Sequence, residues 1–280
     1  MTRPRRTDTL TAATATAGSP VGARPRAIAT PPHAPGRAIA WLAPTILVAL
    51  LLTLPHATPL FHAWFPEVTH PLYWRTSFAQ LALAHALLVV VATAIAIVAG
   101  LSLGILATRP AGRSLLPTVR AVAVIGQTFP PVAVLAIAVP LLGFGAAPTL
   151  LALALYGVLP VLGQTIAGLQ QVPASALHAA DGMGYGRWRR LWEVELPLAA
   201  GPIMAGVRLS AIVSVGTATI GSAVGAATLG APIVEGLVGN NTAYVVQGAL
   251  LVGALALTVD SALGTVERRV KRHRPEHGTL

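Results

Sequence analysis

The sequence predicts an all-α, polytopic membrane protein with about six transmembrane helices. Hydrophobic residues make up 54% of the chain and charged residues 10%, whereas ordinary soluble domains carry about 25% charged residues. The mean hydropathy is +0.71. Apolar stretches of roughly 18 or more residues recur, each long enough to cross about 30 Å of hydrocarbon as a helix. The expected spans cover residues 38–55, 79–107, 121–142, 148–169, 201–226 and 243–264.

The residues before and after the first span differ in character. Residues 1–37 are rich in Ala, Thr, Pro and Arg without hydrophobic periodicity, which is typical of a disordered tail. The first span has a very long lead-in and no convincing cleavage site, so we expect a retained helix and not a signal peptide. The loop that follows carries Trp64, Tyr73 and Trp74, residue types that favour the membrane–water interface.

Spans two to six are apolar runs that contain several prolines. Pro130, Pro131 and Pro160 would break soluble helices, but neighbouring helices can re-satisfy the freed backbone groups in a membrane bundle. We therefore expect residues 121–142 to form one span. Glycine- and alanine-rich faces in the later spans are suited to close helix contact.

Basic residues predict the orientation. If there are six spans, 17 of the 19 Lys and Arg residues lie on one face of the membrane, and these residue types concentrate on the cytoplasmic side. We therefore expect a transmembrane domain over 38–267, a basic cytoplasmic tail over 268–280, and both termini in the cytoplasm. This placement accounts for the net charge of +10 without a nucleic-acid partner.

The polar segment 175–197, between spans four and five, carries the most specific pattern. It resembles the cytoplasmic coupling loop of ABC-importer permeases, which reads Glu-Ala-Ala, three residues, Gly, nine residues, Ile, one residue, Leu-Pro. Val194 takes the Ile place, and His178 stands where the family has Glu. The positions that agree are Ala179, Ala180, Gly184, Leu196 and Pro197.

The segment's own chemistry predicts two short helices. The first, 175–184, has Ser175 as a cap for its free N–H groups, and the second, 187–196, ends at Pro197. Trp188 and Trp192 are four residues apart and share a helix face. Exposed tryptophans suit insertion into a protein groove, although an amphipathic helix on the membrane surface is the alternative. Arg189 and Glu193 are also four apart and can pair.

The resemblance extends over residues 79–269 and is greatest to osmoprotectant permeases for glycine betaine, choline and carnitine. Relatives often have Gly-Ala-Gly-Gly-Leu-Gly-Glu-Pro where this chain has Ala227, Thr228 and Ala231 at three of the positions. The stretches that carry the resemblance are 126–130, 140–145, 191–198, 216–219 and 220–233.

The resemblance implies two permease subunits (copies of one chain or a pair of paralogues), two cytoplasmic ATPases and an external solute-binding protein, assembled in the inner-membrane lipid. The chain has no phosphate-binding Gly-Lys-Ser/Thr loop, and its one lysine is Lys271, so ATP and Mg²⁺ belong to the ATPase. We expect no catalytic residues, bound cofactor or metal site, because no nucleophile elbow or metal-ligand spacing is present.

Four polar residues are candidates for the translocation pathway: Gln127, Thr128, Thr217 and Thr219. Each could instead form a helix–helix hydrogen bond. The spans after the first contain no tryptophan, so no aromatic cage for a quaternary amine is evident. An importer for another small nutrient, such as an amino acid, is the alternative. A secondary transporter is disfavoured because the first five spans lack Asp and Glu.

The last expectation is an intramembrane ion pair. Arg208 lies about 10 Å inside span five at 1.5 Å per residue, and Asp260 lies a few residues inside the same end of span six. Intramembrane charges usually find partners, so we expect these two to interact. The alternative is that Arg208 reaches the headgroups while Asp260 sits in interfacial water.

Overall fold

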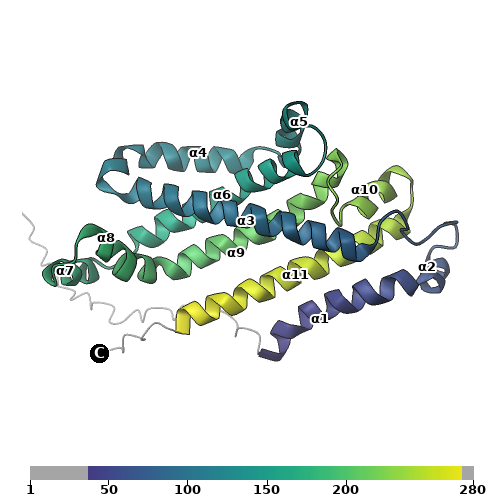
Figure 1. Ribbon diagram of the computed structural model, residues 1–280, viewed down its shortest axis with the longest axis horizontal. Coiled ribbons are helices and arrows are strands. Elements are labelled where there is room, and N and C mark those ends of the chain that lie inside the picture. The colour runs from purple at the N-terminus through teal and green to yellow at the C-terminus, as the bar shows by residue number, and fades with distance from the viewer. Residues whose placement is uncertain (1–36, 273–280) are drawn as a thin grey trace, which may run out of the picture. The chain divides into compact units, whose positions relative to one another are not determined.

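Helices make up every regular element in the computed structural model, which describes residues 37–272 (Figure 1). The elements are α1 (Arg37–Thr53), η1 (Leu54–His56), α2 (Thr58–Trp64), α3 (Phe78–Thr108), η2 (Pro110–Leu115), α4 (Leu116–Thr128), α5 (Pro131–Leu142), α6 (Ala146–Gln170), α7 (Ala174–Gly182), α8 (Arg187–Arg190), η3 (Leu191–Glu195), α9 (Leu196–Gly221), η4 (Ser222–Val224), α10 (Ala231–Val238) and α11 (Thr242–Arg272). The predicted all-α class is confirmed, and the expected tail 1–37 lies almost wholly outside the described residues.

Four helical stretches are long and apolar enough to cross a membrane. They are α3, α6, the run Arg187–Val224 that includes α9, and Thr242–Arg269 within α11. The number rises to six if two bent pairs each count as one span: α1 with α2, bent by 81°, and α4 with α5, bent by 93°. The expectation of about six spans therefore holds only with broken spans included.

Residues 121–142, expected as one span, do not form one continuous helix, because α4 and α5 meet at a sharp bend. Phe129 and Pro130 are both extended, with ψ of 135° and 131°. The residue before a proline is driven out of the α region, and Pro130 and Pro131 in succession remove two backbone donors. The Tyr156 hydroxyl of α6 donates to the Phe129 carbonyl, which holds the broken segment against the next helix.

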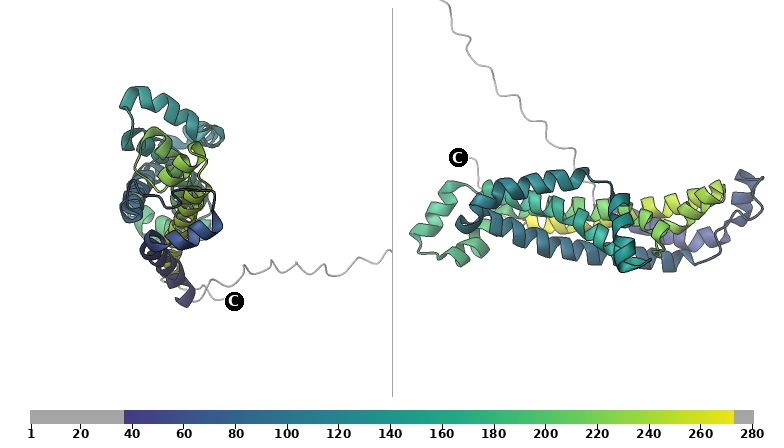
Figure 2. Two further views of the ribbon diagram at one scale, coloured as in Figure 1. Left: turned by 90° about the vertical axis from the view of Figure 1, so that its right-hand side faces the viewer. Right: turned by 90° about the horizontal axis from the view of Figure 1, so that it is seen from above.

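The long helices pack around α6. Helix α6 lies against α3 and α9, α9 lies against α11, and α1 and α10 pack on α11; Figure 2 shows this bundle in two further views. The contact between α6 and α9 requires a glycine, because a Cβ on Gly206 would lie only 2.9 Å from the Pro160 carbonyl oxygen.

The two ends of the bundle differ. The basic end, defined by η2, α7, α8 and the last turns of α11, is at the left of Figure 1, and α2 and α10 lie toward the right. At this opposite end Trp64 and Trp74 are exposed as expected. Tyr73 is not: it is buried, its ring lies 5.4 Å edge-on from Tyr244, and its N–H donates to Gln247 of α11. The loop is thus pinned by a buried glutamine that hydropathy does not reveal.

Candidate functional site

The segment between α6 and α9 begins with helix α7, which starts one residue before the expected position. Pro173 occupies the N-cap, and its carbonyl accepts from Ala176 N and Leu177 N. Ser175 lies inside the first turn, so its predicted capping role is wrong. The proline suits this place because an N-cap residue takes an extended conformation, here with φ of −60° and ψ of 134°.

Gly184 turns the chain at the end of α7. Its φ is +76°, and the backbone forms the two bonds of a Schellman motif: Gly184 N to Asp181 O at 3.0 Å and Tyr185 N to Ala180 O at 3.0 Å. A left-handed residue at this position favours glycine. The glycine of the recognised pattern is therefore the residue that reverses the chain between the two short helices.

The second short helix does not end at Pro197, contrary to expectation. Helix α8 passes into a π-helical turn, Leu191–Glu195, which continues as α9. Leu196 N donates to Leu191 O, five residues back. An α-helical turn would press the Pro197 ring against the Glu193 carbonyl four residues earlier. We attribute the continuity to the wider π turn, which moves that carbonyl away.

Several side chains of this segment, which we call the coupling segment (175–197), form an exposed set. Trp188 and Trp192 are 73% and 62% exposed. Arg189 Nε lies 3.0 Å from a Glu193 carboxylate oxygen, so the expected i,i+4 pair forms. Of the matched positions, Ala180 is buried, Leu196 is half-buried, and Ala179, Gly184 and Pro197 are exposed. His178, which stands in place of the family's Glu, is exposed as well.

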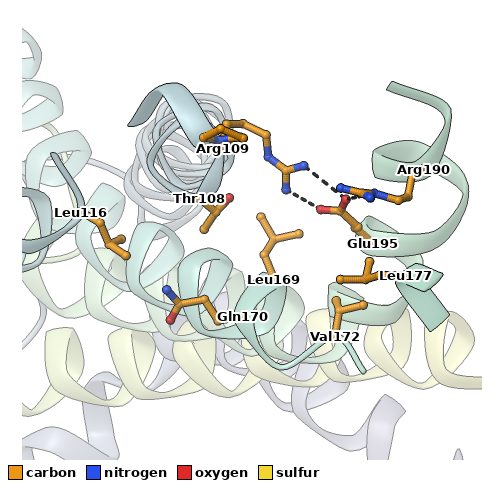
Figure 3. Close-up of a pocket in the computed structure, with 10 residues that line it drawn as sticks. Thr108, Arg109, Leu116, Leu169, Gln170, Val172, Leu177, Arg190 and Glu195 are labelled. Carbon is orange, nitrogen blue, oxygen red and sulfur yellow. Dashed lines mark hydrogen bonds and ion pairs between the residues drawn. The ribbon is translucent and has the colours of Figure 1, made fainter. Parts of the chain in front are cut away.

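The buried carboxylate of Glu195 connects the coupling segment to the end of α3 (Figure 3). Glu195 is 5% exposed and accepts from Arg109 at the end of α3 and from Arg190 of α8. Arg190 in turn donates to both oxygens of Asp181 in α7, at 2.7 and 2.9 Å. This network was not expected from the sequence. A glutamate directly before the apolar run of α9 was the available signal, because a carboxylate at that boundary needs a cation.

Arg208 and Asp260, which were expected to interact, are brought together. Arg208 Nε lies 2.6 Å from Asp260 Oδ1, and Nη2 lies 2.7 Å from Oδ2. This two-pronged geometry is the strong form of a guanidinium–carboxylate contact. Glu267, which lies after Asp260 on the same helix α11, also approaches, with Oε2 3.4 Å from Arg208 Nη1. The arginine therefore faces two carboxylates of α11, of which only Asp260 was expected.

The candidate pathway residues lie in two places. Gln127 and Thr128 are exposed at the end of α4, beside the bend. On α9, Thr217 is buried and Thr219 is half-buried. The hydroxyls of Thr128 and Thr219 donate to carbonyls of their own helices, those of Ile125 and Gly216, and so do not bridge between helices. Within residues 37–272 no group of three or more His, Asp or Glu side chains could hold a metal ion.

Comparison with known proteins places this geometry in a family. Residues 100–272 match the family described as "Binding-protein-dependent transport system inner membrane component". The osmoprotectant import permease protein OsmY of Salmonella typhimurium is 37% identical over 189 residues, 68% of this chain and 80% of that protein. The glycine betaine/carnitine/choline transport system permease protein OpuCB of Bacillus subtilis is 40% identical over 174 residues, 60% of this chain and 80% of that protein.

Solved structures agree at the level of the fold. An inward-facing MetNI methionine ABC transporter aligns with a TM-score of 0.63 and 22% identity over 69% of this chain and 95% of its own. An amino acid ABC transporter with histidines aligns with a TM-score of 0.57 and 20% identity over 78% and 98%. The family match over residues 100–272 contains α6, the coupling segment, α9 and α11. The chain therefore belongs to the family of binding-protein-dependent transport system inner membrane components, the permease subunits of ABC importers.

Proposed function

We propose that this chain is the permease subunit of an ATP-driven importer for a quaternary-amine osmoprotectant such as glycine betaine, choline or carnitine. The observation that carries the proposal is the identity of 37% to OsmY and 40% to OpuCB, each over 80% of the relative. The names of these relatives specify osmoprotectant and glycine betaine/carnitine/choline transport.

In this proposal the coupling segment docks on the cytoplasmic ATPase, which holds ATP and Mg²⁺. Trp188 and Trp192 supply large apolar surface for a groove in the partner, together with His178 and Ala179. Gly184 sets the angle between the two short helices, Ala180 packs inward, and Leu196 and Pro197 join the segment to α9. Movement of the ATPase thereby reaches a membrane helix without a flexible linker.

The proposed orientation puts the basic end in the cytoplasm. Arg187 and Arg190 lie in α8, and Arg109 caps α3 directly before η2. Lys and Arg concentrate on the cytoplasmic side of a membrane. Helix α11 also finishes there, so the tail 268–280 is cytoplasmic, and so is the tail 1–37. The end that carries α2 and α10 then faces an external solute-binding protein.

The proposed pathway runs between this subunit and a second permease, either another copy or a paralogue. Gln127, Thr128 and Thr219 are at least partly accessible on this subunit, and Thr217 is buried on the same helix as Thr219. A few hydroxyl and amide groups give a weakly polar route, which suits a conduit that must release its cargo. Selectivity would come from the external binding protein.

The test is reconstitution. The permease is placed in proteoliposomes with the ATPase and the solute-binding protein encoded beside it, and ATP-driven uptake of radiolabelled glycine betaine, choline and carnitine is measured. Proline and a panel of other amino acids serve as competing cargo. We expect uptake of at least one quaternary amine. Tight binding and uptake of an amino acid alone would overturn the osmoprotectant assignment, while ATP-independent uptake would point to a secondary transporter.

A further inference from the structure

The Glu195 carboxylate is the point at which the coupling segment meets α3. Its oxygen Oε1 lies 3.2 Å from Arg109 Nη1 and 3.1 Å from Arg190 Nε, and Oε2 accepts from Arg109 Nη2. One buried group thus receives three guanidinium N–H bonds from two directions (Figure 3). Arg109 is the C-cap residue of α3, and Arg190 closes α8.

The charges in this network balance. Arg109 and Arg190 bring two positive charges, and Glu195 and Asp181 bring two negative charges. A buried carboxylate is costly unless it is paired and hydrogen-bonded. Without Glu195 the two guanidinium groups would face each other across the gap. The network therefore stabilises one particular placement of α8 against the end of α3.

The helices differ in how they are joined to the coupling segment. Helices α6 and α9 are continuous with it in the chain, whereas α3 reaches it only through side chains. The space between α3 and the segment is partly hollow: a cavity of about 530 Å³ is lined by Thr108, Arg109, Leu169, Gln170, Arg190 and Glu195. Beside this cavity, Ile105 of α3 packs against the buried cluster of Leu169, Leu191 and Ala199, so the ion pairs and this apolar contact together connect α3 to the segment.

We propose that Glu195 is a positioning residue that ties the movement of the coupling segment to α3. This inference rests on the proposed coupling of the segment to an ATPase. When the partner shifts α8, Arg190 and Glu195 move with it, and the two-pronged contact with Arg109 draws the end of α3 along. The two central helices α3 and α9 then move together, although only α9 is covalently linked to α8.

The first experiment compares uptake per ATP hydrolysed in proteoliposomes for wild type, E195Q, R109Q and the double variant. E195Q removes the negative charge, and its NH2 group cannot accept from a guanidinium, so at least one of the three hydrogen bonds is lost and the others lose their charge assistance. We expect E195Q and R109Q each to lower the ratio of uptake to ATP hydrolysis about tenfold, with ATP turnover retained. The double variant should be no worse than either single variant, because both remove the same link.

Two further variants serve as controls. R120Q removes one exposed arginine from the same end of the bundle and leaves the Glu195 network intact, so its ratio should stay at the wild-type value. R109K keeps the charge without the planar fork, and it provides the comparison if E195Q does not fold. Unchanged ratios in E195Q and R109Q, or an equal loss in R120Q, would overturn the proposal.

The second experiment does not depend on transport. The chain has no cysteine, so a pair at Ala111→Cys and Ala174→Cys, both exposed, can be spin-labelled without interference. We expect a narrow distance distribution between η2 and α7 in wild type and a broad one in E195Q. The same narrow distribution in both would refute the link. A narrow wild-type distribution without any ATP-driven uptake would instead remove the proposed function and leave the structural link standing.

Discussion

Gly184 has a φ of +76°, and no atom lies within 4 Å of the place where a Cβ would be added. Space therefore does not require a glycine here; the backbone conformation does. A non-glycine residue in the left-handed region costs roughly 1–2 kcal/mol. Gly186, two residues later, has a φ of −66° and is equally open, so it offers a matched position at which a side chain is tolerated.

We predict that G184V disturbs coupling and that G186A does not. The valine strains the Schellman turn and changes the angle between α7 and α8, so ATP-driven uptake should fall about tenfold, as expected for roughly 1.4 kcal/mol, while the protein still inserts. Uptake, ATP turnover and membrane content are measured for both variants. Equal uptake in G184V and wild type would show that the turn geometry does not matter for coupling.

The sequence predicts some parts of the candidate site and not others. The resemblance of Ala179, Ala180, Gly184 and Pro197 to a known pattern located the coupling segment, and in the structure Gly184 forms the left-handed turn and Ala180 is buried. The Arg109–Glu195 bridge joins residues that are 86 positions apart, and nothing local at either residue names the other. Arg208 and Asp260 were easier to pair because depth in the membrane leaves an intramembrane charge few partners.

At the scale of elements, α9 and α11 are strapped together by charge. Arg208 of α9 faces Asp260 and Glu267 of α11, with side-chain exposures of 38%, 33% and 16%. The two carboxylates are not equivalent: Asp260 makes the two-pronged contact, and Glu267 makes one longer contact at 3.4 Å. Among these three residues, Glu267 can still pair with Arg208 if Asp260 is replaced, whereas no second cation can replace Arg208.

This asymmetry predicts unequal effects of two substitutions. R208Q removes the cation that both carboxylates share and should cost about 3 kcal/mol, the lower end for breaking a buried pair, because the groups are partly exposed. D260N leaves Arg208 beside Glu267 and should cost about half as much. The exposed Arg75–Glu235 pair supplies the control R75Q, with an expected cost of about 0–1 kcal/mol. Unfolding of the purified variants in detergent gives the comparison, and equal losses for R208Q and D260N would show that Glu267 cannot substitute.

Hydropathy predicts the position of the long helices, whereas the bends and turns between helices depend on backbone chemistry. The long helices α3, α6 and α11 follow from continuous apolar runs. The bend after Thr128 depends on Pro130 and Pro131 together, and the apolar composition of residues 121–142 does not predict it. Likewise, Pro197 suggested a helix end, but the π turn Leu191–Glu195 relieves the clash, and the helix continues.

For the whole molecule, the proposed orientation is testable residue by residue because the chain contains no cysteine. Trp74 and Met183 are 74% and 64% exposed at opposite ends of the bundle. In spheroplasts that express the permease without its ATPase, a membrane-impermeant maleimide should label W74C and not M183C. After the membrane is permeabilised, both should react. Labelling of M183C in intact spheroplasts would show that the orientation is the opposite of the proposed one.

The Arg208–Asp260 contact also has a consequence for how the protein is made. Asp260 follows Arg208 by 52 residues, so at about 5–20 residues per second the ribosome adds Asp260 roughly 3–10 s after Arg208. Until then the guanidinium has neither carboxylate of α11 as a partner and must be accommodated by water or headgroups. The Arg208–Asp260 contact can therefore form only after the last helix has been made, and a nascent chain halted before Asp260 leaves α9 without this contact.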